Sequence, residues 1–349
     1  MKTSSTTPPR DPVGTLVPAW TPVAGLPRAR ALSEALLAAG ARTGSVPPDV
    51  AAVTGARERL ERGLAAAVAG AGDAAAPASL LRIGHYQVAR VLGGLGVPGR
   101  PCDQRGALDH APEAHVFRWT SRAARRSVGL AALRAGLDGR APTPADAVAL
   151  VMSDPGGPFG VGRAGPGSCA DWIASLAPAA RSFVAAEATA WTTRLWTGVE
   201  WDRLGPQGPQ GPLVGGPDLW WRWTGSAAGG GDGTRCEVAV RGRADVRVDP
   251  GPASGGTRRG AHLVVLDGQP GVATRHALLL TALVAALSIR RSKQPVSVPA
   301  RVVGWWPDCG KAWVVPVDGR ALALAAEAVV RTAAATLGED APGGRAGGN

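Results

Sequence analysis

The pattern of hydrophobic and polar residues changes period near the middle of the chain. In the first half, apolar residues recur every three or four positions, which is the spacing of one helix face. This spacing predicts helices within 29–71, 78–95, 116–137 and 177–196. Glycines near 136 and 139 are typical of a helix C-terminus and set the end of the third region.

Beyond a Gly/Pro-rich loop at 205–217, the pattern becomes that of β-strands. The segments 219–225 and 236–248 are joined by SAAGGGDGT, which indicates a hairpin. A buried strand in HLVVLDGQPG (262–271) follows. The remaining pattern predicts a helix at 275–291, strands at 300–307 and 312–317, and a closing helix at 319–337. This order of strands and helices predicts an α/β fold.

These elements divide the chain into regions. We expect a flexible tail over 1–27, a mainly helical region over 28–200, an α/β core over 201–338 and a disordered tail over 339–349. The helix at 177–197 is expected to pack on the core. The N-terminal sequence has no apolar segment of a signal peptide. The apolar run 276–289 is shorter than the roughly 20 residues that span a bilayer. We therefore expect a cytoplasmic protein without membrane contact.

The charge of the chain favours a polyanionic partner. Its 349 residues include 38 Lys and Arg against 27 Asp and Glu, a net charge of +11. Such an excess suits DNA. Nearly all of the positive charge is arginine, however, and a GC-rich genome also accumulates arginine. Four arginines fall on one face of the 116–137 helix, either as a DNA contact or as a solvated face: Arg118, Arg122, Arg125 and Arg126.

Several classes of chemistry lack their sequence signals. The four cysteines are widely separated, without the close pairs of a zinc or iron–sulfur site, and we expect free thiols. No HExxH spacing, Walker lysine or G-x-S-x-G motif is present. The tryptophans of LWWRW (219–223) can stack on bases. Strand alternation, however, points about half of them toward the core.

Two acids near strand ends carry the clearest candidate chemistry. Asp245 lies in RGRADVRV and Asp267 in LVVLDGQPG. Carboxylates on neighbouring strands can share Mg²⁺, because hard cations prefer oxygen ligands. A metal ion at this position activates water and stabilises charge on a phosphate. The alternative is structural, since aspartate is also favoured in the turns that follow strands.

The second half resembles a known nuclease superfamily. GRADVRV, HLVVLDGQPG, the apolar helix and VPARVVGWWPDCGKAWVV together resemble the PD-(D/E)XK nuclease-like superfamily, in its RecB-type exonuclease-domain branch common in actinobacterial genomes. The resemblance implies a restriction-endonuclease-like mixed sheet flanked by helices. It also implies DNA as the partner and Mg²⁺ held by Asp245 and Asp267 for phosphodiester hydrolysis. A helical acid is usually required as well, and Glu187 is the candidate. The alternative for Glu187 is an ion pair with a neighbouring arginine.

The chain departs from this superfamily at the positions that supply charge. Gln269 occupies the lysine position of the D-x-K motif, so it can position water but adds no charge. The histidine often found in the preceding helix is absent at 128–130. Arg275 lies just downstream and is within reach of the site, with a geometry unlike that of lysine. We therefore expect a DNA-engaging protein with weakened or lost hydrolysis, or an inactive scaffold that binds a protein partner. An arginine-lined groove converging on the two acids favours DNA, and scattered arginines favour the scaffold.

Overall fold

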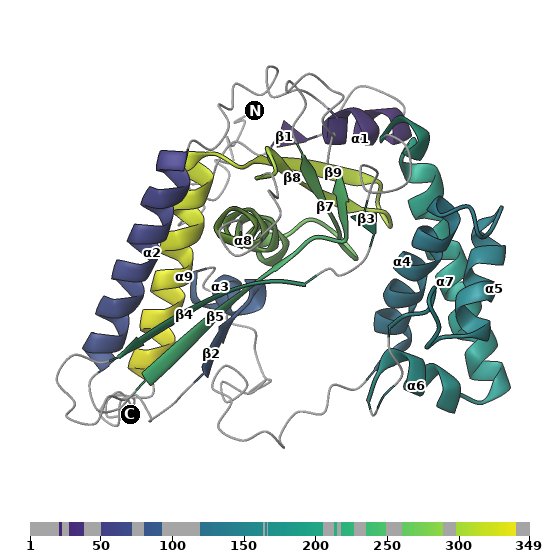
Figure 1. Cartoon of the computed structure of the whole chain (residues 1–349), viewed down its shortest axis with the longest axis horizontal. Coiled ribbons are helices and arrows are strands. Elements are labelled where there is room, and N and C mark those ends of the chain that lie inside the picture. The colour runs from purple at the N-terminus through teal and green to yellow at the C-terminus, as the bar shows by residue number, and fades with distance from the viewer. Residues whose placement is uncertain are drawn as a thin grey trace, which may run out of the picture.

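Two β-sheets lie at the centre of the fold, and helices pack around them (Figure 1). The computed structural model describes residues 21–22, 28–37, 50–71, 80–92, 119–162, 165, 167–204, 213–214, 218–226, 235–248, 260–288 and 298–339. The predicted α/β class, with helices packed on mixed sheets, is confirmed.

The larger sheet is mixed. Within the described residues its strand order is β1-β9-β8-β7-β6-β3. Among the described strands of this larger sheet, β7 and β8 are the one parallel pair. Parallel strands need a crossover connection, which α8 (Val272–Ser288) provides. The strands are β1 (Thr21–Pro22), β3 (Leu213–Val214), β6 (Val246–Val248), β7 (Ala261–Val265), β8 (Arg301–Trp306) and β9 (Lys311–Pro316). Every residue of β7 and β8 is buried, as expected for the centre of a covered sheet.

The smaller sheet contains the predicted hairpin and one strand that the sequence pattern did not predict. β4 (Asp218–Ser226) and β5 (Arg235–Arg243) pair antiparallel, and β2 (Leu80–Ile83) pairs parallel to β5. The prediction of a helix throughout 78–95 is therefore wrong over 80–83. Leu81 and Ile83 are buried while Arg82 is exposed, and pairing with β5 selects this alternation. The helical part is α3 (His85–Leu92).

The long strand predicted over 236–248 is interrupted at Asp245. β5 ends at Arg243 in the smaller sheet, and β6 begins at Val246 in the larger one. The chain thus changes sheets within two residues, and Asp245 lies at the junction. The periodicity of two continues across the break, which is why the sequence pattern does not reveal it.

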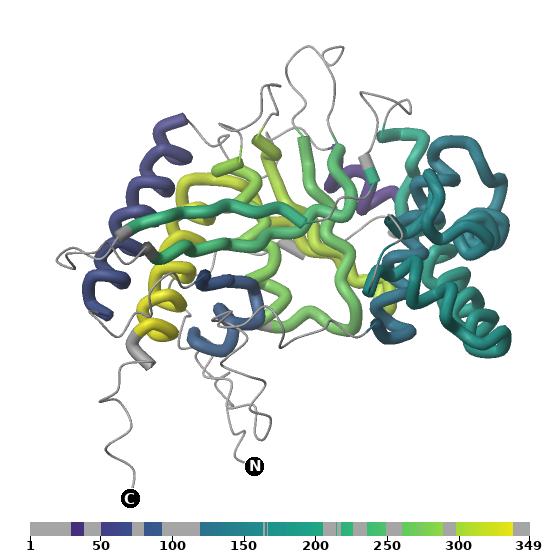
Figure 2. Tube along the Cα trace, turned by 60° about the horizontal axis from the view of Figure 1, so that its bottom comes forward, coloured from purple at the N-terminus to yellow at the C-terminus, as the bar shows by residue number. Residues whose placement is uncertain are grey.

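The helices α2 and α9 lie at one end of the molecule and α4 to α7 at the other, a separation that Figure 2 also shows. α2 and α9 pack along each other and, with α3 and α8, cover the smaller sheet. α4 to α7 form a bundle with its own apolar core. A third cluster joins the bundle to the larger sheet through residues such as Leu133, Trp191 and Leu263. The bounds are α1 (Arg28–Leu37), α2 (Val50–Ala71), α4 (Ser121–Leu137), α5 (Pro144–Ser153), α6 (Cys169–Ser175), α7 (Pro178–Gly198), the 3₁₀ helix η4 (Trp201–Leu204) and α9 (Gly319–Glu339).

The predicted mainly helical region therefore contributes to both halves of the fold. Its segments 50–71 and 80–92 pack with the C-terminal core, while 119–198 forms the bundle. Thr21 and Pro22, within the expected tail, pair with β9. The rest of that tail, and residues 340–349, lie outside the described residues. Of the helices described, none has the length and apolar character needed to cross a membrane. Among the described cysteines, Cys169 and Cys309 are free thiols, and Cys102 lies outside the described residues.

Candidate nucleic-acid interface

Asp245 is built into the junction between the two sheets. Its side chain is 0% exposed. Its backbone amide donates to the Leu263 carbonyl at 2.9 Å, and its Oδ2 accepts from the Val265 amide at 2.8 Å. The carboxylate thus takes over a backbone acceptor role at the point where the chain leaves the smaller sheet. This role is structural, because the buried Val265 amide of β7 would lack a hydrogen-bond acceptor without the Asp245 carboxylate.

Two arginines neutralise the buried Asp245 carboxylate. Arg126 of α4 places Nη2 at 2.6 Å from Oδ2, and Arg243 of β5 places Nε at 2.9 Å from Oδ1. Burial lowers the pKa of Arg126 to about 10, and the charge of Asp245 opposes that shift. Arg126 therefore stays protonated at neutral pH. A buried carboxylate with two guanidinium partners and a backbone amide is fully satisfied.

Asp267 also receives arginines from α4. It follows β7, before a turn in which Gly268 has a φ of 79°. Arg125 Nη2 donates to Oδ1 at 3.0 Å, and Arg122 Nε lies 3.5 Å from Oδ2. Arg126 Nη1 lies 4.0 Å from the same oxygen, so its guanidinium reaches both acids. The fold thus brings Asp245 and Asp267 to one place, with an arginine between them.

The donor set around these acids does not fit a divalent cation as arranged. Each of the four carboxylate oxygens has a guanidinium group within 3.5 Å. These positively charged guanidinium groups would repel a Mg²⁺ ion placed between the two acids. The residues described contain no cluster of three or more His, Cys, Asp or Glu side chains that could hold a metal ion. As arranged, the two acids are therefore partners of arginine side chains.

The other predicted site residues lie around this pair rather than in it. Gln269 is exposed, and its Oε1 accepts from Lys311 Nζ at 3.4 Å. Glu187 lies 3.7 Å from Arg125 Nη1, the ion pair that the sequence left open as its alternative role. Arg275 is placed over the ring of Trp313, with 5.1 Å to the centroid. Arg118 lies outside the described residues.

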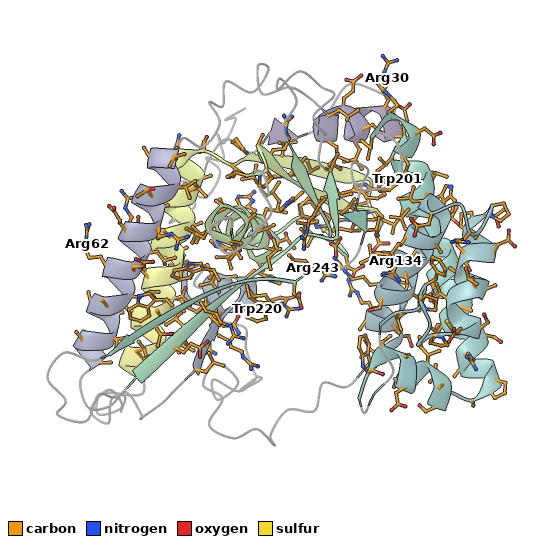
Figure 3. All side chains as sticks on the ribbon, in the orientation of Figure 1. Arg30, Arg62, Arg134, Trp201, Trp220 and Arg243 are labelled. Carbon is orange, nitrogen blue, oxygen red and sulfur yellow. The ribbon has the colours of Figure 1, made fainter. Side chains whose placement is uncertain are left out.

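Two pockets of about 510 and 560 Å³ meet at Arg126 and Arg243, which line both. Arg134 of α4 lines the larger one, and Figure 3 labels it together with Arg243. Arg122 and Arg241 line the smaller one, where Asp267 is the one acid among the lining residues that the structure describes. We call the surface of these two neighbouring pockets the arginine groove, defined by Arg122, Arg126, Arg134, Arg241 and Arg243.

Sequence reasoning missed three groove residues. Arg241 and Arg243 precede Asp245 at spacings of two, so the alternation RGRAD could have placed all three on one side of a strand. Arg134 follows Arg126 by eight residues on α4. His85 also lines the smaller pocket, and burial, followed by the charges of Arg241 and Arg243, lowers its pKa to about 4. It is therefore neutral at neutral pH.

In comparisons with protein-family models, with curated proteins and with solved structures, nothing matches this chain.

Proposed function

We propose that this chain engages DNA through the arginine groove, on a restriction-endonuclease-like core whose metal-dependent hydrolysis is lost. One observation carries the proposal. Five arginines from α4 and β5 line two pockets that share Arg126 and Arg243, and Asp267 is the one acid among the described lining residues. This is the convergence of arginines on the two acids that favours DNA over a scaffold.

The groove keeps positive charge after its ion pairs are counted. Arg134 donates to the carbonyls of Pro158 and Gly160, and no acid of the described part of the chain forms an ion pair with it. The Arg122 side chain is 63% exposed and only 3.5 Å from its acid, a weak pair in water. Guanidinium groups bind phosphate oxygens in a bidentate manner. A phosphodiester backbone is therefore a fitting ligand.

Loss of hydrolysis follows from where the charges lie. In the PD-(D/E)XK nuclease-like superfamily, which this sequence resembles, the two acids hold the metal and a lysine adds positive charge. Here Asp245 forms ion pairs with Arg126 and Arg243, and Asp267 forms one with Arg125. Gln269 supplies no charge at the lysine position, and its carbonyl oxygen accepts from Lys311. The arrangement binds anions and lacks a nucleophile-activating centre.

DNA binding by groove variants tests the proposal. Arg122→Gln with Arg241→Gln removes two exposed groove charges without touching the buried Asp245. We expect the affinity for labelled DNA, measured by fluorescence anisotropy, to fall by about tenfold or more, because a hydrogen bond to a charged group contributes about 1.5–3 kcal/mol. The same DNA, incubated with wild-type protein and Mg²⁺ or Mn²⁺, is expected to stay intact on a denaturing gel.

The matched control is Arg59→Gln with Arg62→Gln on α2, where both side chains are exposed. Arg62 lies at the opposite end of the molecule from Arg134 (Figure 3). Equal losses in both double variants would mean that net charge alone drives binding. Absence of DNA binding by the wild type would favour the protein-binding scaffold, and metal-dependent cleavage would show that hydrolysis is retained.

A further inference from the structure

Two exposed aromatic rings lie beside the smaller pocket of the arginine groove. Tyr86, the second residue of α3, is 72% exposed and is one of the residues that line this pocket. Trp220 on β4 is 38% exposed. Large aromatic side chains usually bury their surface, so two exposed rings at one site need a partner to explain them. We call Tyr86 and Trp220 the aromatic rim.

Strand geometry fixes Trp220 on the outer face of the smaller sheet. In LWWRW the neighbouring Trp221 is 3% exposed and packs in the core, whereas Trp220 points the other way. Figure 3 shows Trp220 on the side of β4 away from α8. Of the three tryptophans in LWWRW, Trp220 faces outward, while Trp221 and Trp223 pack with the core.

Arg241 connects the rim to the groove. It is the cross-strand partner of Trp220, and its guanidinium carbon lies 5.7 Å from the centroid of that ring. The same side chain lines the pocket with Tyr86. Asp218 also binds Arg241, at 2.8 Å from Nη2, and this pair holds the guanidinium beside the ring. On the Tyr86 side, the ring of His85 lies 4.2 Å from that of Tyr86.

We propose that the aromatic rim stacks the unpaired bases of a single strand whose phosphates lie in the arginine groove. This inference rests on the proposed function and names the form of nucleic acid. Stacking needs an exposed base face, which a closed duplex hides between neighbouring pairs. Aromatic platforms beside a positive groove are how single strands are bound without a sequence code.

Ring-removing variants test the inference. Tyr86→Leu and Trp220→Leu keep apolar volume but remove the π-face. We expect each to weaken binding of a labelled oligo-dT strand by about fivefold or more. Binding of a hairpin duplex of equal length should change by less than about twofold, since its bases are stacked on each other. Tyr86→Phe and Trp220→Phe keep a ring and should retain most of the oligo-dT affinity.

The matched control is Phe183→Leu, because Phe183 is 58% exposed on α7 but lines neither pocket. It should bind both DNA forms like the wild type. The rim also fits the unpaired bases of RNA, so a labelled oligo-U strand is run in parallel. The rim variants should weaken its binding too, and the ratio of wild-type affinities shows whether the sugar matters.

The outcomes separate this inference from the proposed function. If the groove variants weaken DNA binding and the rim variants do not, the inference is wrong while the proposed function stands. If the rim variants weaken duplex and single strand alike, the rings do not select unpaired bases and the inference is also wrong. If the wild type binds no nucleic acid, both are wrong.

Discussion

At the scale of single residues, the two acids have different roles. Asp245 is fully buried and accepts from a backbone amide and two arginines, so it fixes the junction between the sheets. Asp267 is partly exposed and lies against Arg122 and Arg126, which also line the groove. A carboxylate in this position occupies guanidinium groups that a phosphate would otherwise bind. Under the proposed function, Asp267 thus competes with DNA phosphates for these guanidinium groups.

Replacing Asp267 should therefore strengthen DNA binding. In Asp267→Asn, Arg122 and Arg125 lose a competing charge, and we expect the DNA affinity to rise by up to about fivefold, since such pairs contribute up to about 1 kcal/mol. Fluorescence anisotropy at constant salt measures this change. Glu200→Gln, which removes an exposed pair with Arg203, is the control. If Asp267→Asn instead lost DNA binding at every salt and protein concentration tested, Asp267 would not be a competitor. That result would indicate that Asp267 acts through a bound metal.

At the scale of elements, α4 carries the groove and its position is set by close packing on α7. A Cβ at Gly129 would collide with the ring of Trp191, and one at Gly136 with that of Trp196. Glycine at 129 therefore has a packing reason, and it occupies the segment where the resembling nucleases often carry a histidine. The same close approach holds the α4 arginines against the acids.

Gly129→Ala should destabilise the fold by about 1–3 kcal/mol, the usual cost of overpacking a filled core. Gly55→Ala on α2 is the matched control, because nothing lies within 4 Å of its added Cβ. That substitution should stabilise the protein by about 0.5–1 kcal/mol through helix propensity. Chemical denaturation followed by circular dichroism measures both. Equal effects of the two substitutions would contradict the proposed packing.

Some of the helices and strands could be predicted from the sequence, and others could not. The helices predicted at 177–196 and 275–291 correspond to α7 (Pro178–Gly198) and α8 (Val272–Ser288), and the predicted hairpin corresponds to β4 and β5. β2 was missed because its four residues acquire their strand pattern only by pairing with β5. The sequence singled out Asp245 and Asp267 at neighbouring strand ends, and Arg126 contacts both of them. The sequence did not reveal that arginines 119 and 142 residues earlier neutralise them, since such contacts depend on how the bundle packs.

At the scale of the whole molecule, buried histidines make stability depend on pH. His262 of β7 is buried, and desolvation, followed by the charge of Arg247, lowers its pKa from 6.5 to about 3. His85 and His276 are shifted in the same direction. The folded protein keeps these rings neutral at a pH where the unfolded chain protonates them. Their contribution is present above pH 6.5 and is lost as the pH falls toward these lowered values.

We expect the free energy of unfolding to decrease between pH 6.5 and 5, with a slope approaching about 1.4 kcal/mol per pH unit for each such histidine. His262→Gln removes one titrating ring, so its slope should be smaller by that amount. Urea denaturation at several pH values measures the slopes. Identical slopes in the wild type and in His262→Gln would show that His262 does not stay neutral in the folded state.

The salt dependence of DNA affinity is the most direct measurement of whether the arginine groove binds phosphates. Each phosphate neutralised contributes about 0.7–0.9 to the slope of log affinity against log salt. Arg122→Gln with Arg241→Gln should therefore lower the magnitude of the wild-type slope by about 1.4–1.8, and Arg59→Gln with Arg62→Gln should leave it unchanged. A slope that the groove variant does not alter would contradict DNA binding by the arginine groove.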